Sequence, residues 1–361
     1  MPIAIPIWRR FLSASRRNDY RHQLGILIGI SSESLSPSPG IRNSRLSAKI
    51  VGQPAAVDAI IPYIHMFQAG LSPEGRPLGV FLLLGPTGTG KTWTVEALAD
   101  VLHGSTKNVL RIDCGEYQME HEMSKLTGAP PGYLGHRETH PILTQSSLTA
   151  VTSETCGASI VLFDEIEKAA PSMNKLLLGI LDKAALRLGD NSVVNFDRSL
   201  IFLTSNLGAR NMMKELGPGF GFPGEGISPA DMTSRMIRVA EEAARRRFSP
   251  EFMNRVDAVV TYQPLADTSL RAILDLQIQE LQLHIEKRLA HRAFRLYVSD
   301  QSRKLLLTKG TSTQYGAREI RRTLRKFITQ PLASLLAEGR VPAGSSVQAI
   351  PKGDSLQLRL G

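Results

Sequence analysis

Cysteine is nearly absent from this 361-residue sequence, which contains only Cys114 and Cys156. The two are too far apart to form a CxxC or CxxxC pair, so the spacing excludes a cysteine-based zinc site and a disulfide framework. Such sparing use of cysteine is typical of a reducing compartment. We therefore expect a cytoplasmic protein.

Long apolar runs are also missing. The longest, LGILIGI at 24–30 and VFLLL at 80–84, are far shorter than the ~20 residues that a helix needs to cross a bilayer. We expect no association with membranes. Hydrophobic residues make up 42% of the chain and charged residues 21%, which is ordinary for a globular protein and excludes wholesale disorder.

Half of the excess positive charge lies near the amino terminus. The net charge is +10, and residues 1–48 contribute +5 because seven arginines oppose only Asp19 and Glu33. This segment contains the turn-rich run SSESLSPSPG (31–40) and no sustained period, so we expect a mostly disordered extension. Its arginine-rich, acid-poor character is also typical of a transit peptide, which leaves an organellar matrix as the alternative compartment.

From residue 50 onward, short apolar runs alternate with helical spacing. The run at 80–84 precedes a helical pattern at 92–102. Further strands are expected at 109–112, 159–163 and 200–203, and helices at 173–181 and 231–248. Strands joined by helical crossovers predict an α/β fold with a parallel sheet covered by helices.

The pattern changes after residue 264. Apolar residues mark one face of a helix between 270 and 289, and short strands are expected at 294–298, 348–350 and 356–360. This predicts a smaller, mainly helical α+β domain. The expected organisation is an extension at 1–48, a large domain at 49–263 and a small domain at 264–361.

The sequence GPTGTGKT (85–92) fits the pattern G-x-x-x-x-G-K-[ST] between an expected strand and an expected helix. Glycines let backbone N–H groups approach phosphate oxygens, and the helix start adds its positive dipole. Lys91 would reach the β- and γ-phosphates, and the Thr92 hydroxyl would ligate Mg²⁺. The alternative is a glycine-rich turn that matches by chance. We predict that ATP and Mg²⁺ bind here, at Gly85, Pro86, Thr87, Gly88, Thr89, Gly90, Lys91 and Thr92.

A second motif, SIVLFDE (159–165), is an apolar run that ends in Asp164 and Glu165. Ligands bind at the carboxyl ends of strands in open parallel sheets. Asp164 is expected to hold the metal through water, and Glu165 to polarise the attacking water. The alternative is a solvated acidic start to the following helix.

Five further segments resemble the AAA+ Clp ATPase family, which includes ClpA, ClpB and ClpC. In the order typical of that family, they are IVGQ (50–53), TGAPPGYLG (127–135), FLTSNLG (202–208), PEFMNRVD (250–257) and YGAR (315–318). Residues 50–360 resemble one ATPase module, most closely the second ring of two-ring members. The resemblance implies an AAA+ P-loop sheet, a Clp-type small domain and a homo-hexameric ATPase.

The resemblance also implies roles for single residues. Val51 would contact adenine, Asn206 would be the first sensor that orients water, Arg255 would act on the ATP of a neighbouring subunit, and Arg318 would be the second sensor. Three of these residues also have a simpler interpretation. Asn206 could form a turn, Arg255 could pair with a surface acid, and Arg318 could belong to the basic run at 318–326.

Tyr133 lies in the segment that resembles the family's central pore loop. It is flanked by the turn formers Pro130, Pro131, Gly132 and Gly135, which predicts that the ring projects from a constrained loop. An aromatic ring with a hydroxyl can pack on any extended chain. The resemblance implies that Tyr133 grips polypeptide, and the alternative is a ring packed against its own domain.

Other segments depart from the family pattern. Residues 183–196 (KAALRLGDNSVVNF) differ from the DGRLTDGxGR type, which puts the second pore loop in doubt. Phe220, Gly221 and Phe222 resemble the hydrophobic-Gly-Phe tripeptide that docks on ClpP, although an aliphatic residue usually comes first. Residues before 50 match no substrate domain, first ring or middle domain of the family, so we expect substrates to be recognised otherwise.

Together these features predict an ATP-dependent unfoldase that threads unfolded or tagged proteins through the pore of a homo-hexamer, with a ClpP-like protease as a candidate partner. A nucleic-acid motor is the alternative because of the net charge and the basic run at 318–326. That run has no interleaved aromatic residues for base stacking, so we expect no nucleic-acid partner. A third alternative is a ring that binds ATP without hydrolysing it. Such a ring would lack the catalytic acid or the arginine that acts on a neighbouring subunit's ATP, whereas Glu165 and Arg255 are both present.

Overall fold

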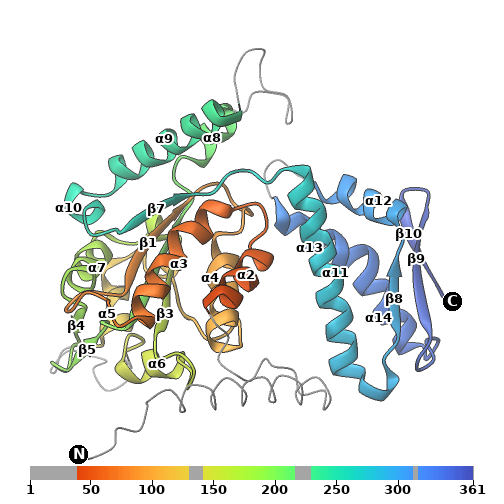
Figure 1. Ribbon diagram of the computed structural model, residues 1–361, viewed down its shortest axis with the longest axis horizontal. Helices are drawn as coiled ribbons and strands as arrows, with labels where there is room; N and C mark the ends of the chain where they lie inside the picture. Colours follow the sequence, from red (N-terminus) through yellow and green to blue (C-terminus); the bar gives the residue numbers. More distant parts are fainter. Residues whose placement is uncertain (1–38, 130–140, 216–228, 312–315, 361) are drawn as a thin grey trace, which may run out of the picture. The chain divides into compact units, whose positions relative to one another are not determined.

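The computed structural model describes residues 39–129, 141–215, 229–311 and 316–360 (Figure 1). Tyr133 and the tripeptide at 220–222 lie outside the described residues, as does most of the expected extension. Residues 45–361 form one compact unit. Within the described ranges, no helix is both long and apolar enough to span a membrane.

Five parallel strands form the central sheet, in the order β2-β3-β6-β1-β7. They are β1 (Gly79–Leu84), β2 (Leu110–Asp113), β3 (Ser159–Asp164), β6 (Ser199–Ser205) and β7 (Ala258–Thr261). The predicted parallel α/β sheet is confirmed. β7 was not expected from the sequence, because only Ala258, Val259 and Val260 are apolar there and this run is shorter than those that predicted the other strands. β1, β3 and β6 are buried along their whole length, as the continuous apolar runs require.

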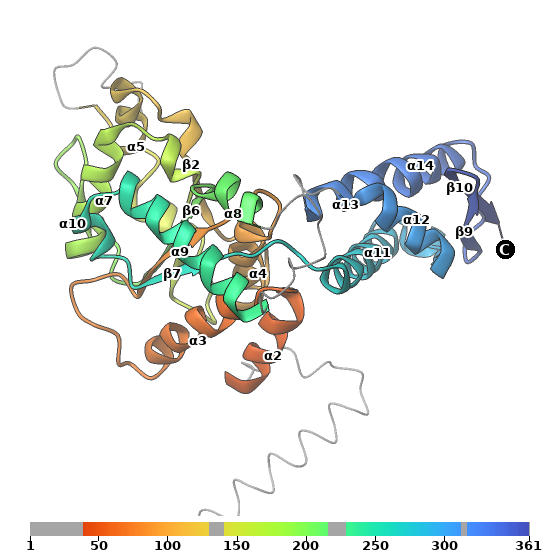
Figure 2. The ribbon, with the colours of Figure 1, turned by 90° about the horizontal axis from the view of Figure 1, so that it is seen from above.

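Helices cover both faces of the sheet (Figures 1 and 2). Because side chains alternate along a strand, β1 contributes to two apolar cores. Its even-numbered residues pack with α7 (Pro171–Lys183) and α9 (Pro229–Arg247). Its odd-numbered apolar residues pack with α3 (Pro54–Gln68) and α4 (Lys91–His103). The short elements of this part are α5 (Ser124–Thr127), α6 (Gln145–Ala150), α8 (Ala209–Glu215), α10 (Pro250–Met253) and the antiparallel pair β4 (Ala185–Arg187) and β5 (Val193–Asn195).

Helix α2 (Pro39–Lys49) differs from the sequence-based expectation, because it covers the last residues of the segment expected to be disordered. Leu46 is only 2% exposed and belongs to the same apolar core as Ile50. Burial of this side chain explains why regular structure begins before residue 49.

In the described residues of the C-terminal part, four α-helices accompany a second sheet. Its three strands have the order β10-β9-β8, and its apolar core extends from Leu265 to Leu356. The expected boundary at residue 264 stays a prediction. The elements are α11 (Asp267–Leu289), β8 (Arg295–Val298), α12 (Asp300–Gly310), α13 (Ala317–Leu324), α14 (Gln330–Ala337), β9 (Ser346–Lys352) and β10 (Ser355–Leu360).

Candidate functional site

The loop between β1 and α4 has the backbone conformation that its glycines allow. Gly85, Gly88 and Gly90 have φ values of 142°, 79° and 104°, which residues other than glycine rarely adopt. A Cβ atom on Gly85 would also lie 2.5 Å from the carbonyl oxygen of Tyr262. The predicted phosphate-binding loop therefore needs glycine both for its conformation and for its packing on Tyr262, which directly follows β7.

Lys91 is the first residue of α4, and its ammonium group turns back over this loop. Nζ donates hydrogen bonds to the carbonyl oxygens of Gly85 (2.7 Å) and Pro86 (2.9 Å) and to Oδ1 of Asn206 (3.0 Å). The side chain is buried, and desolvation lowers the pKa of Lys91 to about 8, although Glu167 and Asp164 oppose that shift. Lys91 thus loses its charge at a lower pH than an exposed lysine does.

This pKa predicts that nucleotide affinity depends on pH. Phosphate groups favour the protonated ammonium. Above pH 8 the free protein has mostly neutral Lys91, so nucleotide binding must be accompanied by uptake of a proton at this side chain. We expect constant affinity below pH 8 and a decrease approaching about tenfold per pH unit above it. Titration with a fluorescent ATP analogue between pH 6.5 and 9.5 would measure this. Lys91→Arg is the control, because its guanidinium stays charged and should flatten the curve. A flat curve for the wild type would contradict the assignment.

Oxygen ligands suited to Mg²⁺ meet where β3 ends. The Thr92 hydroxyl lies 3.4 Å from Oδ1 of Asp164, and Thr204 of β6 donates its hydroxyl to the same oxygen. Mg²⁺ in nucleotide sites is usually held by one or two carboxylates together with phosphates. Among the described residues, no cluster of three or more His, Cys, Asp or Glu side chains could hold a metal by itself. The hydroxyl of Thr92 and the carboxylate of Asp164 are the kinds of oxygen that would hold Mg²⁺ together with the phosphates of a nucleotide.

Glu165 and Asn206 form a hydrogen-bonded link to Lys91. Asn206 Nδ2 donates to Glu165 Oε1 (3.3 Å), while Asn206 Oδ1 accepts from Lys91 and, at 3.4 Å, from Thr87. Glu165 has a φ of 58°, and its backbone N–H donates to Thr204 Oγ1 (3.0 Å). Left-handed conformations of residues other than glycine cluster at functional sites. The structure thus joins three predicted groups: the base, the sensor and the lysine expected to bind phosphate.

Several residues of this cluster were not named from the sequence. Glu167 Oε1 accepts the backbone N–H of Asn206 (3.1 Å), and Lys168 forms an ion pair with Glu165. Thr204 contacts both acids of the SIVLFDE motif, and Arg111 of β2 pairs with Asp164. Glu167 and Lys168 lie two and three residues after Glu165, in EIEK, a local signal that could have been used. Thr204 and Arg111 come from neighbouring strands, and only the order of the strands brings them here.

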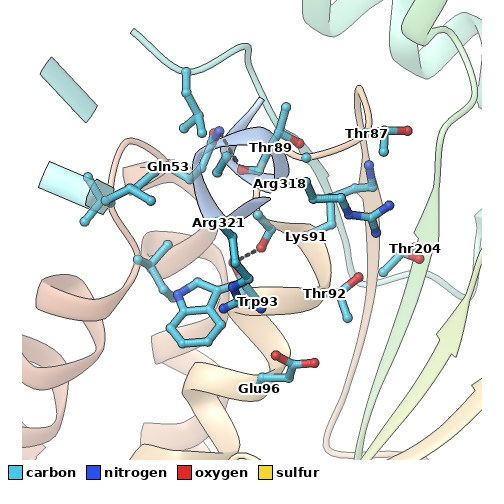
Figure 3. Close-up of a pocket in the computed structure, with 18 of the residues that line it drawn as sticks. Gln53, Thr87, Thr89, Lys91, Thr92, Trp93, Glu96, Thr204, Arg318 and Arg321 are labelled. Atoms are coloured by element: carbon cyan, nitrogen blue, oxygen red, sulfur yellow. Dashed lines mark hydrogen bonds between the residues drawn. The ribbon is translucent and has the colours of Figure 1, made fainter. Parts of the chain in front are cut away.

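A pocket of about 490 Å³ extends from the phosphate-binding loop towards α11 and α13 (Figure 3). Val51 lines it, and its role as an adenine contact stays a prediction. Gln53 is buried beside it and donates to the carbonyl oxygens of Gln263 (2.8 Å) and Thr89 (3.3 Å). The Trp93 indole N–H donates to the carbonyl oxygen of Lys49 (3.0 Å). The segment 49–53 is therefore held against the end of the phosphate-binding loop that leads into α4.

The start of α13 contacts the phosphate-binding loop directly. The backbone N–H of Ala317 donates to the carbonyl oxygen of Gly88 (3.1 Å), and a Cβ on Gly316 would lie 2.7 Å from that oxygen. Arg318 lines the pocket, with Arg321 one turn further along (Figure 3). The structure thus brings the predicted second sensor to the nucleotide pocket.

Arg255 does not line this pocket. Its guanidinium pairs with Asp182 (3.2 Å) and Glu251 (3.3 Å) and donates to the Glu251 carbonyl oxygen (3.0 Å). A role of Arg255 at a neighbouring subunit's site therefore stays a prediction.

A glycine-shaped phosphate loop, a lysine at its helix start and acids at the end of a nearby strand define a P-loop ATPase. Residues 76–259 match the family described as AAA domain (Cdc48 subfamily), and residues 265–349 match the C-terminal, D2-small domain of ClpB protein. The chain therefore belongs to the AAA family of ATPases. Its resemblance to a second-ring module of the Clp ATPases is confirmed.

Known proteins of this family resemble the chain over most of its length. The chaperone protein ClpB of Rhizobium meliloti is 35% identical over 316 residues, which is 88% of this chain and 34% of that protein. Heat shock protein 104 of Schizosaccharomyces pombe is 35% identical over 82% of this chain and 31% of its own length. A closed-state cryo-EM reconstruction of Hsp104 with ATPγS and FITC-casein has a TM-score of 0.73 at 25% identity, covering 93% of this chain and 54% of that one. The chain thus spans about a third of the length of these ClpB and Hsp104 relatives.

Proposed function

We propose that the chain hydrolyses ATP with Mg²⁺ and uses the energy to thread unfolded or tagged proteins through the pore of a homo-hexamer in the cytoplasm. The observation that carries the proposal is the link from Lys91 through Asn206 to Glu165, beside Thr92 and Asp164. It places a phosphate-binding cation, a polar amide and a carboxylate within one hydrogen-bonded cluster. This is the set of groups that water attack on a γ-phosphate requires.

Each residue has a distinct part in the proposed reaction. Lys91 and the loop N–H groups bind the phosphates, and Thr92 and Asp164 would hold Mg²⁺, which neutralises phosphate charge when bound. Glu165 accepts a proton from the attacking water, and Asn206 orients that water. Arg255, which lies outside its own pocket, would stabilise charge on the γ-phosphate of the neighbouring subunit.

Protein is favoured over nucleic acid as the substrate. Much of the basic run that suggested a nucleic-acid motor lines the pocket proposed for ATP, namely Arg318, Arg321, Arg322 and Arg325. The Hsp104 reconstruction similar to this chain contains FITC-casein. The test is ATPase activity with unfolded casein and with DNA. Stimulation by casein alone supports the proposal, and stimulation by DNA alone would favour a nucleic-acid motor.

The β4–β5 hairpin, within the divergent segment 183–196, supports a substrate-handling loop next to it. The backbone N–H of Gly189 donates to the carbonyl oxygen of Thr127 (2.7 Å), and a Cβ on Gly189 would lie 2.7 Å from the carbonyl oxygen of Gly128. Thr127 and Gly128 lead into the segment that contains Tyr133. The hairpin thus contacts the residues from which the proposed pore loop begins.

Docking of a ClpP-like protease through Phe220, Gly221 and Phe222 is proposed from their sequence alone.

Tyr133→Ala should abolish unfolding of a tagged fluorescent substrate while it preserves basal ATP hydrolysis. The ring is proposed to grip the polypeptide, and neither Ala129 nor Pro141, which flank its segment, lines the nucleotide pocket. Substrate fluorescence and phosphate release would be measured in parallel. Tyr133→Phe is the matched control and should retain most unfolding, because it keeps the ring. Equal loss of both activities in Tyr133→Ala would mean that Tyr133 supports the fold.

A further inference from the structure

Arg111 forms a close ion pair with the carboxylate that is expected to hold Mg²⁺. It lies on β2, which pairs with β3, and its Nη2 atom is 2.5 Å from Oδ2 of Asp164. The other Asp164 oxygen accepts from Thr92 and Thr204. Asp164 is 10% exposed in its side chain, whereas Arg111 is 49% exposed and lines the nucleotide pocket. The buried partner is therefore held in place, and the arginine faces the pocket.

A second acceptor for the same guanidinium lies nearby. Nη1 of Arg111 is 3.7 Å from Oε1 of Glu96 on α4. Glu96 lines the same pocket, one helical turn after Thr92. Burial raises the pKa of Glu96, while Arg111 and Arg321 counteract that rise. Arg111 can therefore leave Asp164 and still have a carboxylate partner.

A guanidinium and a divalent cation compete for one carboxylate because like charges repel at short range. Without a metal, Arg111 compensates the charge of Asp164, which would otherwise be buried with only two hydroxyl partners. We propose that the Arg111 guanidinium is the counter-ion of the Asp164 carboxylate and that Mg²⁺ has to displace it. Glu96 is then the carboxylate with which Arg111 pairs. The pair would set the Mg²⁺ concentration that nucleotide binding requires. This inference rests on the proposed function, since it concerns the same Mg²⁺–ATP site.

The test is the binding of a fluorescent ATP analogue, measured as a function of free Mg²⁺. Arg111→Gln should lower the half-saturating Mg²⁺ concentration by roughly tenfold, the effect of removing one positive charge close to a divalent ion. Glu96→Gln should raise it severalfold, because Arg111 loses its alternative acceptor. In the double variant, Glu96→Gln should have no further effect. Arg111→Lys keeps the charge and should behave more like the wild type than Arg111→Gln does.

The variants distinguish competition between Arg111 and the metal from a direct effect of Glu96 on Mg²⁺. If Arg111→Gln leaves the Mg²⁺ requirement unchanged or raises it, Arg111 does not compete with the metal and the inference is overturned. If Glu96→Gln acts equally in both backgrounds, Glu96 attracts the metal directly, which also overturns it. Thermal unfolding without Mg²⁺ checks the fold of each variant, and Glu96→Gln alone tests the proposal if Arg111→Gln does not fold. Failure to bind nucleotide at any Mg²⁺ concentration would instead overturn the proposed function.

Discussion

Glu165→Gln should reduce ATP turnover by about 10²- to 10⁴-fold, the usual contribution of a general base, while nucleotide binding is retained. The amide has the same shape as the carboxylate, so the contact with Asn206 and the left-handed backbone at Glu165 can persist. An amide cannot accept a proton from water at neutral pH, so the chemical step is lost. Phosphate release measures turnover, and titration with a fluorescent ATP analogue measures binding.

Two comparisons make this result specific to catalysis. Lys91→Ala should weaken nucleotide binding itself, because the Lys91 ammonium is central to the phosphate-binding loop. Glu116→Gln is the matched control, since this acid lies outside the pocket lining and its loss should leave turnover unchanged. If Glu165→Gln hydrolyses ATP at the wild-type rate, Glu165 is not the base.

Arg255→Ala should reduce ATP turnover by about 10³- to 10⁵-fold, the range known for arginine fingers, if Arg255 acts across a subunit interface. Mixing Arg255→Ala subunits with Glu165→Gln subunits should then restore part of the activity. A site is active when an Arg255→Ala subunit, which keeps its own Glu165, receives Arg255 from a Glu165→Gln neighbour. Random mixing in equal amounts makes about a quarter of the sites active in a ring with head-to-tail contacts.

Arg246→Ala is the matched control for removal of an arginine. Arg246 is largely exposed, pairs only loosely with Glu242 at 3.9 Å and lines no part of the pocket. Its loss should leave turnover unchanged. If mixed rings are present and no activity returns at any ratio, Arg255 does not act across the interface, and its role is either within its own subunit or structural. The structural role would be its ion pair with Asp182.

Local sequence determined the elements of the site whose partners lie close along the chain. GPTGTGKT predicted a glycine loop between a strand and a helix, and the left-handed φ values at Gly88 and Gly90 agree with it. The run SIVLFDE predicted a buried strand with acids at its end, which is β3. These predictions were possible because a continuous apolar run, a glycine turn and a helix start each depend on neighbouring residues.

The order of the strands, by contrast, was decided only by the tertiary structure. β3 pairs with β6, so Thr204 reaches both Asp164 and Glu165 although about 40 residues separate them. β2 lies on the other side of β3, which brings Arg111 to Asp164. The spacing of these residues along the chain does not predict that Thr204 and Arg111 contact Asp164, because register and strand order follow from packing of the whole sheet.

The sequence by itself therefore determined the phosphate-binding loop, the acidic strand end and the alternation of strands and helices. Tertiary structure decided which side chains surround those groups, the contact of α13 with Gly88 and the burial of Leu46 that orders α2. The physical reason is the range of the interactions. Propensity, glycine conformation and apolar period act over a few residues, whereas ion pairs, cross-strand hydrogen bonds and core packing join segments that are distant in the chain.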